Sequence, residues 1–337
     1  MKTRYIKVIC LLLFISLLVG LYPLIATAAE KVILRASAGP TGTGKDLRIQ
    51  MVAEAIRRGN PKWVVDTING PTTIAEITMI GRGELDFTAL DAVSIPDIAK
   101  GYYGGKKLPK PVNLRWLIPS TAMTCVLYML ENVPINSFAE IKEKKYPAKF
   151  SMGRKGTDPY NILMHVFQAY GYSPDDIVKW GGKRQNTASR RSADLMADGL
   201  MDVFFHAGTY PAPPIAEMER TRKLKAAFVF EPEIQAKLSK KLFIEVPIKA
   251  GSYTFVKNNT TTVAMPSIVV VPDDMKDDVA YNMTRAVWEQ REKFLHPLHP
   301  IFRAYVQPEV ITAWTTKLRN FLHPAAARYW KEQGLLK

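Results

Sequence analysis

Short β-rich segments that alternate with helical segments are the feature that most restricts how this chain can fold. In the first third of the sequence, β-rich apolar runs at 32–36, 63–68 and 85–90 are separated by helical patterns at 45–58 and 72–81. Strands that alternate with helices along the chain are typical of α/β proteins, in which helices cover the faces of a central sheet. The sequence therefore predicts an α/β fold with a mainly parallel sheet.

Two long strands are expected to join this unit to a second α/β unit, which begins near Asn132. Strand patterns lie at 114–119 and 124–130, and a longer apolar run rich in β-branched residues lies at 262–271. The segments 124–130 and 262–271 flank the second unit and are long enough to pass from one unit into the other. We predict two α/β lobes joined by two long crossover strands, with these boundaries: lobe I, residues 29–125 and 262–337; lobe II, residues 126–261.

The first thirty residues have the pattern of a secretory signal peptide. Three of the first seven residues are basic, an apolar run extends from 8 to 21, and Pro23 interrupts it before the small residues Ala26 to Ala28. These are the basic, apolar and cleavage regions of such a signal, so we expect a signal peptide over residues 1–28 and export to the periplasm. The alternative is an uncleaved membrane anchor, because this region is nearly long enough to span a bilayer.

Composition narrows the class of protein further. The chain has 337 residues, of which 47% are hydrophobic and 23% are charged, as in globular proteins. Its two cysteines exclude a disulfide framework and a cysteine-rich zinc module. The formal net charge of +15 would attract nucleic acid, an anionic membrane or an anionic ligand alike. Because the basic residues are scattered without interleaved aromatic residues, we expect no nucleic-acid partner.

A glycine-rich loop at 39–46 is similar to a phosphate-binding loop. Its sequence, Gly-Pro-Thr-Gly-Thr-Gly-Lys-Asp, fits G-x-x-x-x-G-K between a strand and a helix. Backbone N–H groups, the helix dipole and Lys45 would all favour an anion there. However, Asp46 replaces the Ser or Thr that holds Mg²⁺ in nucleoside triphosphatases. The sequence favours an anion-binding loop without nucleotide; an ordinary tight turn and, less favoured, a P-loop-like enzyme are the alternatives.

No other pattern predicts catalysis, a metal or a cofactor. The five histidines include His296 and His299, but no third ligand is apparent near them and no H-E-x-x-H motif is present. The G-x-S-x-G motif of serine hydrolases is also absent, and Cys125 lies in an apolar strand. We therefore expect a protein that is not an enzyme, with no catalytic residue, no metal site and no cofactor.

A longer motif lies at the C-terminal end of the chain. Residues 322–336 read Leu-His-Pro-Ala-Ala-Ala-Arg-Tyr-Trp-Lys-Glu-Gln-Gly-Leu-Leu. This segment resembles the C-terminus of the TAXI-family solute receptors of TRAP transporters, whose usual pattern is L-H-P-G-A-x-R-[YF]-[YF]-x-E-x-G. Further blocks resemble that family in the same order, at 38–56, 81–91, 153–171, 244–253 and 262–264. The resemblance covers nearly all of the chain beyond the predicted signal peptide.

This resemblance implies a type II periplasmic binding protein, whose lobes close on a small solute. It also implies that the protein delivers this solute to the subunits of a TRAP-type membrane permease, which is driven by an ion gradient. Glutamate, glutamine and other small carboxylates are the ligands usually considered for the family. An exported sensor with the same fold is the alternative, because sensing and transport use the same closure of the lobes. We expect a monomer.

The candidate ligand-binding residues lie in loops at the carboxyl ends of strands, where α/β folds bind ligands. This chain departs from the TAXI pattern there, with Asp91 in place of a common glutamine. We expect Lys45, Arg154 and His206 to hold a small organic anion, a carboxylate, unless Lys45 and Arg154 are solvated loop charges. Asp91 would face an amine or hydroxyl of the solute or pair with one of these cations. The full set of candidates is Thr41, Gly42, Thr43, Lys45, Asn69, Asp91, Arg154, Thr157, His206 and Tyr210.

Overall fold

The computed structural model of the chain describes residues 32–39, 41, 43–70, 72–298 and 300–336. The fold lies within the unit Ile33–Lys337. The predicted signal peptide, residues 1–28, and the candidate residue Gly42 lie outside the described residues. Within the described ranges, no helix is both long enough and apolar enough to cross a membrane.

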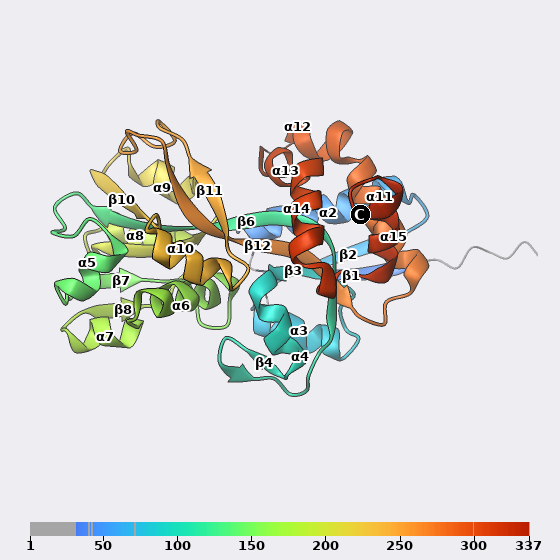
Figure 1. Ribbon diagram of the computed structural model, residues 1–337, viewed down its shortest axis with the longest axis horizontal. Helices are drawn as coiled ribbons and strands as arrows, with labels where there is room; N and C mark the ends of the chain where they lie inside the picture. Colours follow the sequence, from blue (N-terminus) through green and yellow to red (C-terminus); the bar gives the residue numbers. More distant parts are fainter. Residues whose placement is uncertain (1–31, 40, 42, 71, 299, 337) are drawn as a thin grey trace, which may run out of the picture. The chain divides into compact units, whose positions relative to one another are not determined.

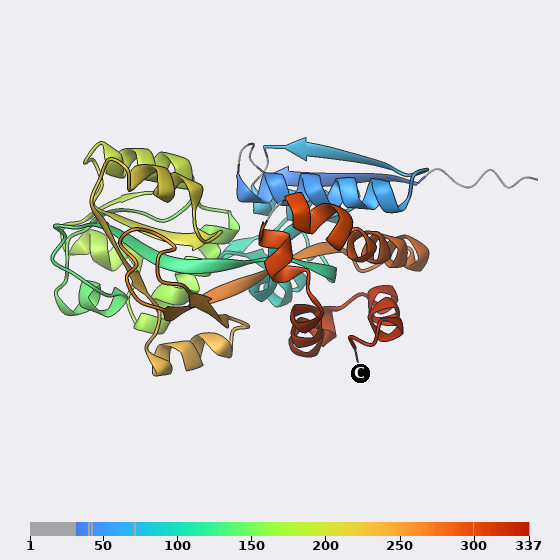
Figure 2. The same ribbon diagram turned by 90° about the horizontal axis from the view of Figure 1, so that it is seen from above.

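The first α/β unit forms as the alternating pattern predicts. Its elements are β1 (Ile33–Gly39), α2 (Gly44–Gly59), β2 (Val64–Asn69), α3 (Thr73–Gly81) and β3 (Thr88–Asp91). β1 and β2 pair in parallel, and a bridge between Ala36 and Phe87 links β1 to the segment that enters β3. Figure 2 shows α2 lying along β1 and β2. This unit therefore places the glycine-rich loop at one end of its strands.

Two long strands, β6 (Leu114–Leu130) and β12 (Thr260–Pro272), pair with each other at the centre of the main sheet (Figure 1). β1 and β2 form a separate two-stranded sheet. β3 pairs with the second half of β12, whereas β11 (Ile244–Ile248) pairs with its first half. β9 (Val203–Gly208) and β10 (Leu224–Phe228) pair with the second half of β6. Both long strands therefore run from one predicted lobe into the other, as the sequence predicts, and the exact lobe boundaries stay a prediction.

The prediction of two separate strands at 114–119 and 124–130 is wrong, because the residues between them also pair with β12. The register shifts where Ser267 pairs with Thr121 and Ile268 pairs with Pro119, so Ser120 has no partner on β12. Such a bulge tolerates a proline, whose nitrogen has no hydrogen to donate to the neighbouring strand. One continuous strand can therefore serve both lobes.

The main sheet is mixed rather than mainly parallel, so this part of the prediction is wrong. Among the described residues, parallel pairing within this sheet is found for β7 (Lys149–Ser151) with β8 (Lys183–Gln185) and with β9. β6 and β12 pair in antiparallel with each other and with β3, β9, β10 and β11. Alternating strands and helices indicate crossover connections within each lobe, but they do not reveal the direction in which the long strands pass their neighbours.

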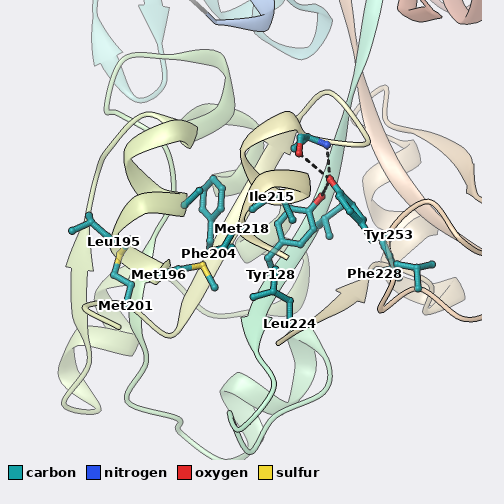
Figure 3. Packing of buried hydrophobic residues seen from close by; sticks show 14 of the residues in the cluster. Tyr128, Leu195, Met196, Met201, Phe204, Ile215, Met218, Leu224, Phe228 and Tyr253 are labelled. Carbon is teal, nitrogen blue, oxygen red and sulfur yellow. Dashed lines mark hydrogen bonds between the residues drawn. The ribbon is translucent and has the colours of Figure 1, made fainter. Parts of the chain in front are cut away.

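Helices and strands of the predicted lobe II enclose an aromatic core. The helices are α5 (Phe138–Glu143), α6 (Asp158–Tyr170), α7 (Pro174–Lys179), α8 (Ser189–Ala197), α9 (Pro213–Met218) and α10 (Pro232–Ser239). Figure 3 shows Tyr128 and Tyr253 side by side in this core, and their rings meet edge to face with centroids 5.9 Å apart. Phe204 from β9 and Ile215 from α9 are buried in the same cluster. Burial of these large side chains is the main term that stabilises such a core.

The C-terminal helices pack on the first half of β6. The C-terminal elements are α11 (Asp277–Glu289), the π-helix η2 (Arg291–Leu295), α12 (His296–Leu298), α13 (Pro300–Tyr305), α14 (Pro308–Lys317), η3 (Arg319–Phe321) and α15 (Pro324–Glu332). Four short elements between β3 and β6 complete the chain: η1 (Ala92–Ser94), α4 (Ile95–Ala99), β4 (Tyr102–Tyr103) and β5 (Lys106–Lys107). Trp330 donates from Nε1 to Leu117 O at 3.1 Å, and Trp116 donates from Nε1 to Leu318 O at 2.9 Å. Both indoles are buried. Because α11 also packs on α2, the C-terminal segment belongs with β1 to β3.

Candidate functional site

The loops predicted to bind the ligand meet where α6 of lobe II approaches lobe I. Asn161 on α6 donates from Nδ2 to Ser94 Oγ at 2.7 Å. Tyr103 donates from its hydroxyl to Asp158 Oδ1, also at 2.7 Å. All four side chains are buried. The first turn of α6 is therefore held against lobe I by two buried side-chain hydrogen bonds, and we call this region the lobe junction.

Two glycines mark further close contacts at the lobe junction. The Gly156 carbonyl accepts a hydrogen bond from Ile74 N at 3.3 Å. A Cβ atom at Gly44, in the first turn of α2, would lie 3.2 Å from Thr209 Cγ2. Since Thr209 follows β9, the amino-terminal end of α2 lies against lobe II. Both the start of α2 and the loop before α6 are therefore part of the lobe junction.

Lys45 lies at the start of α2 and already has a partner. Its ammonium forms an ion pair with Glu76 of α3, and the two side chains are 12% and 0% exposed. Ser37 also donates to Glu76 Oε1, at 2.8 Å. Burial raises the pKa of Glu76, while Lys45 and Ser37 oppose this rise by stabilising the ionised form. Lys45 therefore neutralises a buried carboxylate and is not a solvated loop charge.

A second buried cation, Arg48, lies one helical turn after Lys45 and is absent from the predicted set. It is 4% exposed, and its Nε donates to Ser120 Oγ at 3.2 Å. Neither Nη atom has a hydrogen-bond or ion-pair partner among the described residues. Burial lowers the pKa of Arg48 to about 10, and the negative charge of Asp158 raises it, so the guanidinium is protonated at neutral pH. A basic residue on the buried face of an amphipathic helix is the signal that would have identified it.

Asp91, at the end of β3, is fully buried. Its Oδ1 accepts hydrogen bonds from Ser94 N at 3.0 Å and from Ser94 Oγ at 2.6 Å, and so caps η1. Its Oδ2 has no hydrogen-bond partner among the residues that the structure describes. Burial raises the pKa of Asp91 to about 7, and the negative charge of Asp158 contributes to this rise. The predicted pairing with a candidate cation is not found in the described part of the chain, and contact with a solute stays a prediction.

Arg154 and Thr157 lie together in the loop before α6. Thr157 donates from Oγ1 to Arg154 O at 2.6 Å, and the next residue is the buried Asp158. The guanidinium of Arg154 forms no ion pair or hydrogen bond with any described residue, and the residue is partly exposed. Arg154 is therefore available to an anion, and its two predicted roles, ligand contact and solvated charge, both stay open.

His206 and Tyr210 belong to the interior of lobe II. The His206 side chain is buried, and its ring centroid lies 5.7 Å from that of Tyr128. Burial lowers the pKa of His206 to about 4, so its imidazole is neutral at neutral pH. His206 therefore supplies no positive charge at neutral pH in this conformation, and its contact with a solute stays a prediction. Tyr210 is partly buried and shares a hydrogen bond with Ser252 Oγ at 2.6 Å.

The other candidates lie in lobe I, at the start of α2 or beside it. Thr41 is exposed in the turn before α2. Thr43 caps that helix, since its Oγ1 accepts a hydrogen bond from Asp46 N at 3.3 Å. Asn69 donates from Nδ2 to Asp46 Oδ1 at 2.7 Å. These contacts account for the local structure of the loop, and ligand binding by the three residues stays a prediction.

Two cavities lie on other surfaces of the described chain. One, of about 410 Å³, lies between α5, α6 and α10, beside Tyr170 and Glu231. The other, of about 510 Å³, lies along α15, beside Arg328 and Leu336. None of the described candidate residues lines either cavity. Over the same described residues, no group of three or more His, Cys, Asp or Glu is placed to hold a metal ion.

Solved structures of other proteins share this fold. The chain is similar to the periplasmic binding protein BugD, with 14% sequence identity over 91% of this chain and 99% of that chain, and a TM-score of 0.54. It is also similar to MatC from Rhodopseudomonas palustris, solved with bound malate, with 11% identity over 90% of this chain and 99% of that chain, and a TM-score of 0.55. At such low sequence identities, these structural similarities establish the fold alone. They confirm the predicted two-lobe type II periplasmic binding fold.

The sequence also matches a family model, described as the NMT1-like family, over residues 36–334. The match begins in β1, includes both long strands and ends beyond α15. It therefore covers both lobes and the whole lobe junction. On this evidence the chain belongs to the NMT1-like family.

Proposed function

We propose that this chain is an extracytoplasmic solute-binding protein that captures a small organic anion, a carboxylate, between its two lobes. It then delivers the solute to a TRAP-type membrane permease. The binding site is the lobe junction around Arg48, and capture involves no chemical step. The proposed mechanism is closure of the lobes on the solute, because a solute that contacts both lobes favours the closed arrangement.

The buried guanidinium of Arg48 is the observation that carries the proposal. Its Nε is fixed by Ser120, and both Nη atoms are without a partner among the described residues. A Cβ atom at Gly44 would lie 3.3 Å from Arg48 Nη1 and 3.2 Å from Thr209 Cγ2, so this end of the guanidinium lies beside lobe II. Two parallel N–H groups match the two oxygens of a carboxylate. A buried cation with unused donors is costly unless an anion meets it.

Export and solute binding have support from the fold relatives and from the N-terminal pattern. BugD is a periplasmic binding protein, and MatC holds malate, a small dicarboxylate, in the same fold. The signal-peptide pattern over residues 1–28 favours export to the periplasm. The TRAP-type permease is inferred from the C-terminal motif and the ordered blocks that resemble TAXI receptors.

The position of Lys45 counts against a P-loop-like enzyme. The lysine of such a loop must reach the phosphates of the nucleotide, whereas the ammonium of Lys45 is paired with Glu76. Asp46 also occupies the position where a metal-binding hydroxyl is required. A sensor that uses the same closure is distinguished by its gene neighbours: an adjacent gene for a many-span permease supports transport, and one for a sensor kinase supports signalling.

Native mass spectrometry followed by calorimetry tests the proposal. Protein purified without refolding should retain a small carboxylate, which mass spectrometry identifies. Arg48→Met should weaken the binding of that carboxylate by about ten- to a hundredfold, because one charged hydrogen-bonding group is lost. Arg57→Met is the matched control, since Arg57 lies at the other end of α2 in an ion pair with Glu54. A cationic or uncharged solute, or unchanged affinity in Arg48→Met, would overturn the proposal.

A further inference from the structure

Two neighbouring buried polar atoms at the end of β3 have no partner among the described residues. Asp91 and Ser267 are directly opposite each other in the antiparallel pair of β3 and β12, so their side chains extend from the same face of the sheet. Asp91 Oδ2 and Ser267 Oγ both lack a hydrogen-bond partner in the described chain, and both residues are 0% exposed. Buried polar atoms are rarely left unpaired. A group that this chain does not supply is therefore expected to meet them.

The charges around these atoms favour a group that donates hydrogen bonds. Asp158 of lobe II is 4% exposed, and its negative charge acts on Asp91 of lobe I. Lys45 is already paired with Glu76. The charge of Arg48 acts on Asp158, but no described cation forms an ion pair with Asp91 or Asp158. A solute that is only an anion would add negative charge to this junction, whereas a solute that also carries a donor would compensate it.

We propose that the solute carries a hydrogen-bond donor beside its carboxylate, an ammonium or a hydroxyl group, and that Asp91 and Ser267 bind this donor. The assignment rests on the proposed function, in which Arg48 holds the carboxylate. Asp91 Oδ2 is the acceptor, because Ser94 already occupies Oδ1. Asp91 is then a specificity-determining residue. It rejects a simple carboxylate, because the buried oxygen would be left without a partner.

The spacing across the sheet fits a small solute with two polar ends. Asp91 on β3 pairs with Ser267 on β12, and Ser267 pairs with Thr121 on β6. The residue before Thr121 is Ser120, whose hydroxyl accepts the hydrogen bond from Arg48. Adjacent strands are about 4.8 Å apart, so the backbones at Asp91 and Thr121 are separated by roughly 10 Å. The side chains of Asp91 and Arg48 take up part of this distance. A small molecule is therefore long enough to contact the residues at both ends of this separation.

A buried water molecule is the alternative partner of Asp91 and Ser267. Water also donates hydrogen bonds to buried oxygen atoms and commonly fills such positions. The two occupants differ in their effect on binding. A water stabilises the site whichever carboxylate is bound, whereas a donor on the solute makes the affinity depend on that donor. Discrimination between matched solutes is therefore the decisive measurement.

Calorimetry with matched sets of solutes tests the inference. Each set keeps one carbon skeleton and changes the substituent beside the carboxylate from hydrogen to hydroxyl to ammonium: propionate, lactate and alanine; succinate, malate and aspartate; glutarate, 2-hydroxyglutarate and glutamate. In at least one set, the parent protein should bind a donor-bearing member about ten- to a hundredfold more tightly than the unsubstituted member. The tighter of the hydroxyl and ammonium members identifies the donor.

Asp91→Asn should abolish most of this discrimination and retain the fold. Asparagine keeps an oxygen that accepts from Ser94, and it replaces Oδ2 with an N–H donor that repels the donor of the solute. Ser267→Ala should reduce the discrimination by a smaller factor, since it removes a neutral hydroxyl. Asp202→Asn makes the same chemical change at a partly buried carboxylate of lobe II, which accepts from Lys149 N at 2.8 Å, and is the matched control. Unfolding temperatures check that each variant is folded.

The outcomes separate this inference from the proposed function. Carboxylates that bind without discrimination would overturn the role of Asp91 and leave the proposed function standing. The role is also overturned if Asp91→Asn weakens every member of a set equally, since a structural or water-binding role has that effect. If no carboxylate binds and the solute found by mass spectrometry has no carboxylate, the proposed function fails and the inference fails with it.

Discussion

Replacing Lys45 with methionine should reveal the cost of burying the carboxylate of Glu76. Methionine keeps an apolar stem over Gly39, where a Cβ atom would lie 3.1 Å from Lys45 Cδ, but it removes the ammonium. Glu76, with a side chain 0% exposed, would then retain Ser37 as its described hydrogen-bond partner. Breaking a buried ion pair by removing one partner costs about 3–5 kcal/mol of folding free energy.

The loss of folding free energy in Lys45→Met should depend on pH, in a direction that follows from the pKa of Glu76. Burial raises the pKa of Glu76 in the folded protein even with Lys45 present, and loss of the ammonium raises it further. A carboxyl group with a raised folded pKa destabilises the fold as the pH increases past its unfolded pKa, because the unfolded state ionises more easily. The free-energy difference between the parent and Lys45→Met should therefore be small near pH 4 and full at pH 8.

Thermal unfolding followed by circular dichroism at several pH values measures this difference. The full loss corresponds to a decrease in unfolding temperature of roughly 5–10 °C. Lys144→Met breaks an exposed ion pair with Glu140 on α5 and is the matched control, with an expected cost below about 0.5 kcal/mol. The reasoning is refuted if Lys45→Met is as stable as the parent at pH 8, or if its loss is the same at pH 4 and pH 8.

Changes at α2 and at β3 should also alter stability. Gly59→Ala would place a Cβ atom 2.4 Å from the Ala286 Cβ on α11 and should destabilise the protein by about 1–3 kcal/mol in chemical denaturation. Adding Ala286→Gly should recover part of this loss, and no recovery would contradict the steric explanation. Asp91 has a folded pKa of about 7 against an ordinary value of 3.8. The unfolding free energy of the parent, measured relative to Asp91→Asn, should therefore fall between about pH 4 and about pH 7, by up to about 4 kcal/mol, and parallel pH profiles would contradict this.

The fold is predictable from the sequence where the signals are local. The helix predicted at 45–58 is α2, and the helix predicted at 72–81 is α3. The direction of strand pairing is not a local property. Thr121 and Ser267 pair although more than a hundred residues separate them in the sequence, and β6 continues as one strand through the bulge beside this pair. The alternation of strands and helices contains no information about which distant strands pair or in which direction, so the mixed sheet could not be predicted.

The candidate site is predictable in its location and only partly in its chemistry. Strand ends point to the loops that hold Lys45 and Asp91, and both residues lie at the lobe junction. The charge of Lys45 is cancelled by Glu76, a residue on the next helix that no motif connects with it. Arg48 and Asp158 are buried because the two lobes approach each other there. Which charges remain unpaired therefore depends on tertiary contacts, which counting charges along the sequence does not reveal.

The carboxylates of Asp91 and Asp158, which come from opposite lobes, link binding of the solute to closure of the lobes. Asp91 belongs to lobe I and Asp158 to lobe II, and both are buried where α6 meets lobe I. Bringing two carboxylates together in a buried junction is unfavourable unless one of them takes up a proton or a donor lies beside them. A donor on the solute would remove this penalty. The solute then stabilises the closed arrangement of the lobes more than the open one.

The same argument predicts that Asp91→Asn closes the lobes without any solute. The variant removes the charge that opposes closure, and its side-chain oxygen still accepts hydrogen bonds from Ser94, which in turn accepts from Asn161 of α6. Small-angle scattering of solute-free protein at pH 8 should therefore give a smaller radius of gyration for Asp91→Asn than for the parent. Lowering the pH below the pKa of Asp91 should shrink the parent toward the variant, because protonation removes the same charge. If the two proteins have equal radii at pH 8, repulsion between Asp91 and Asp158 does not hold the lobes apart.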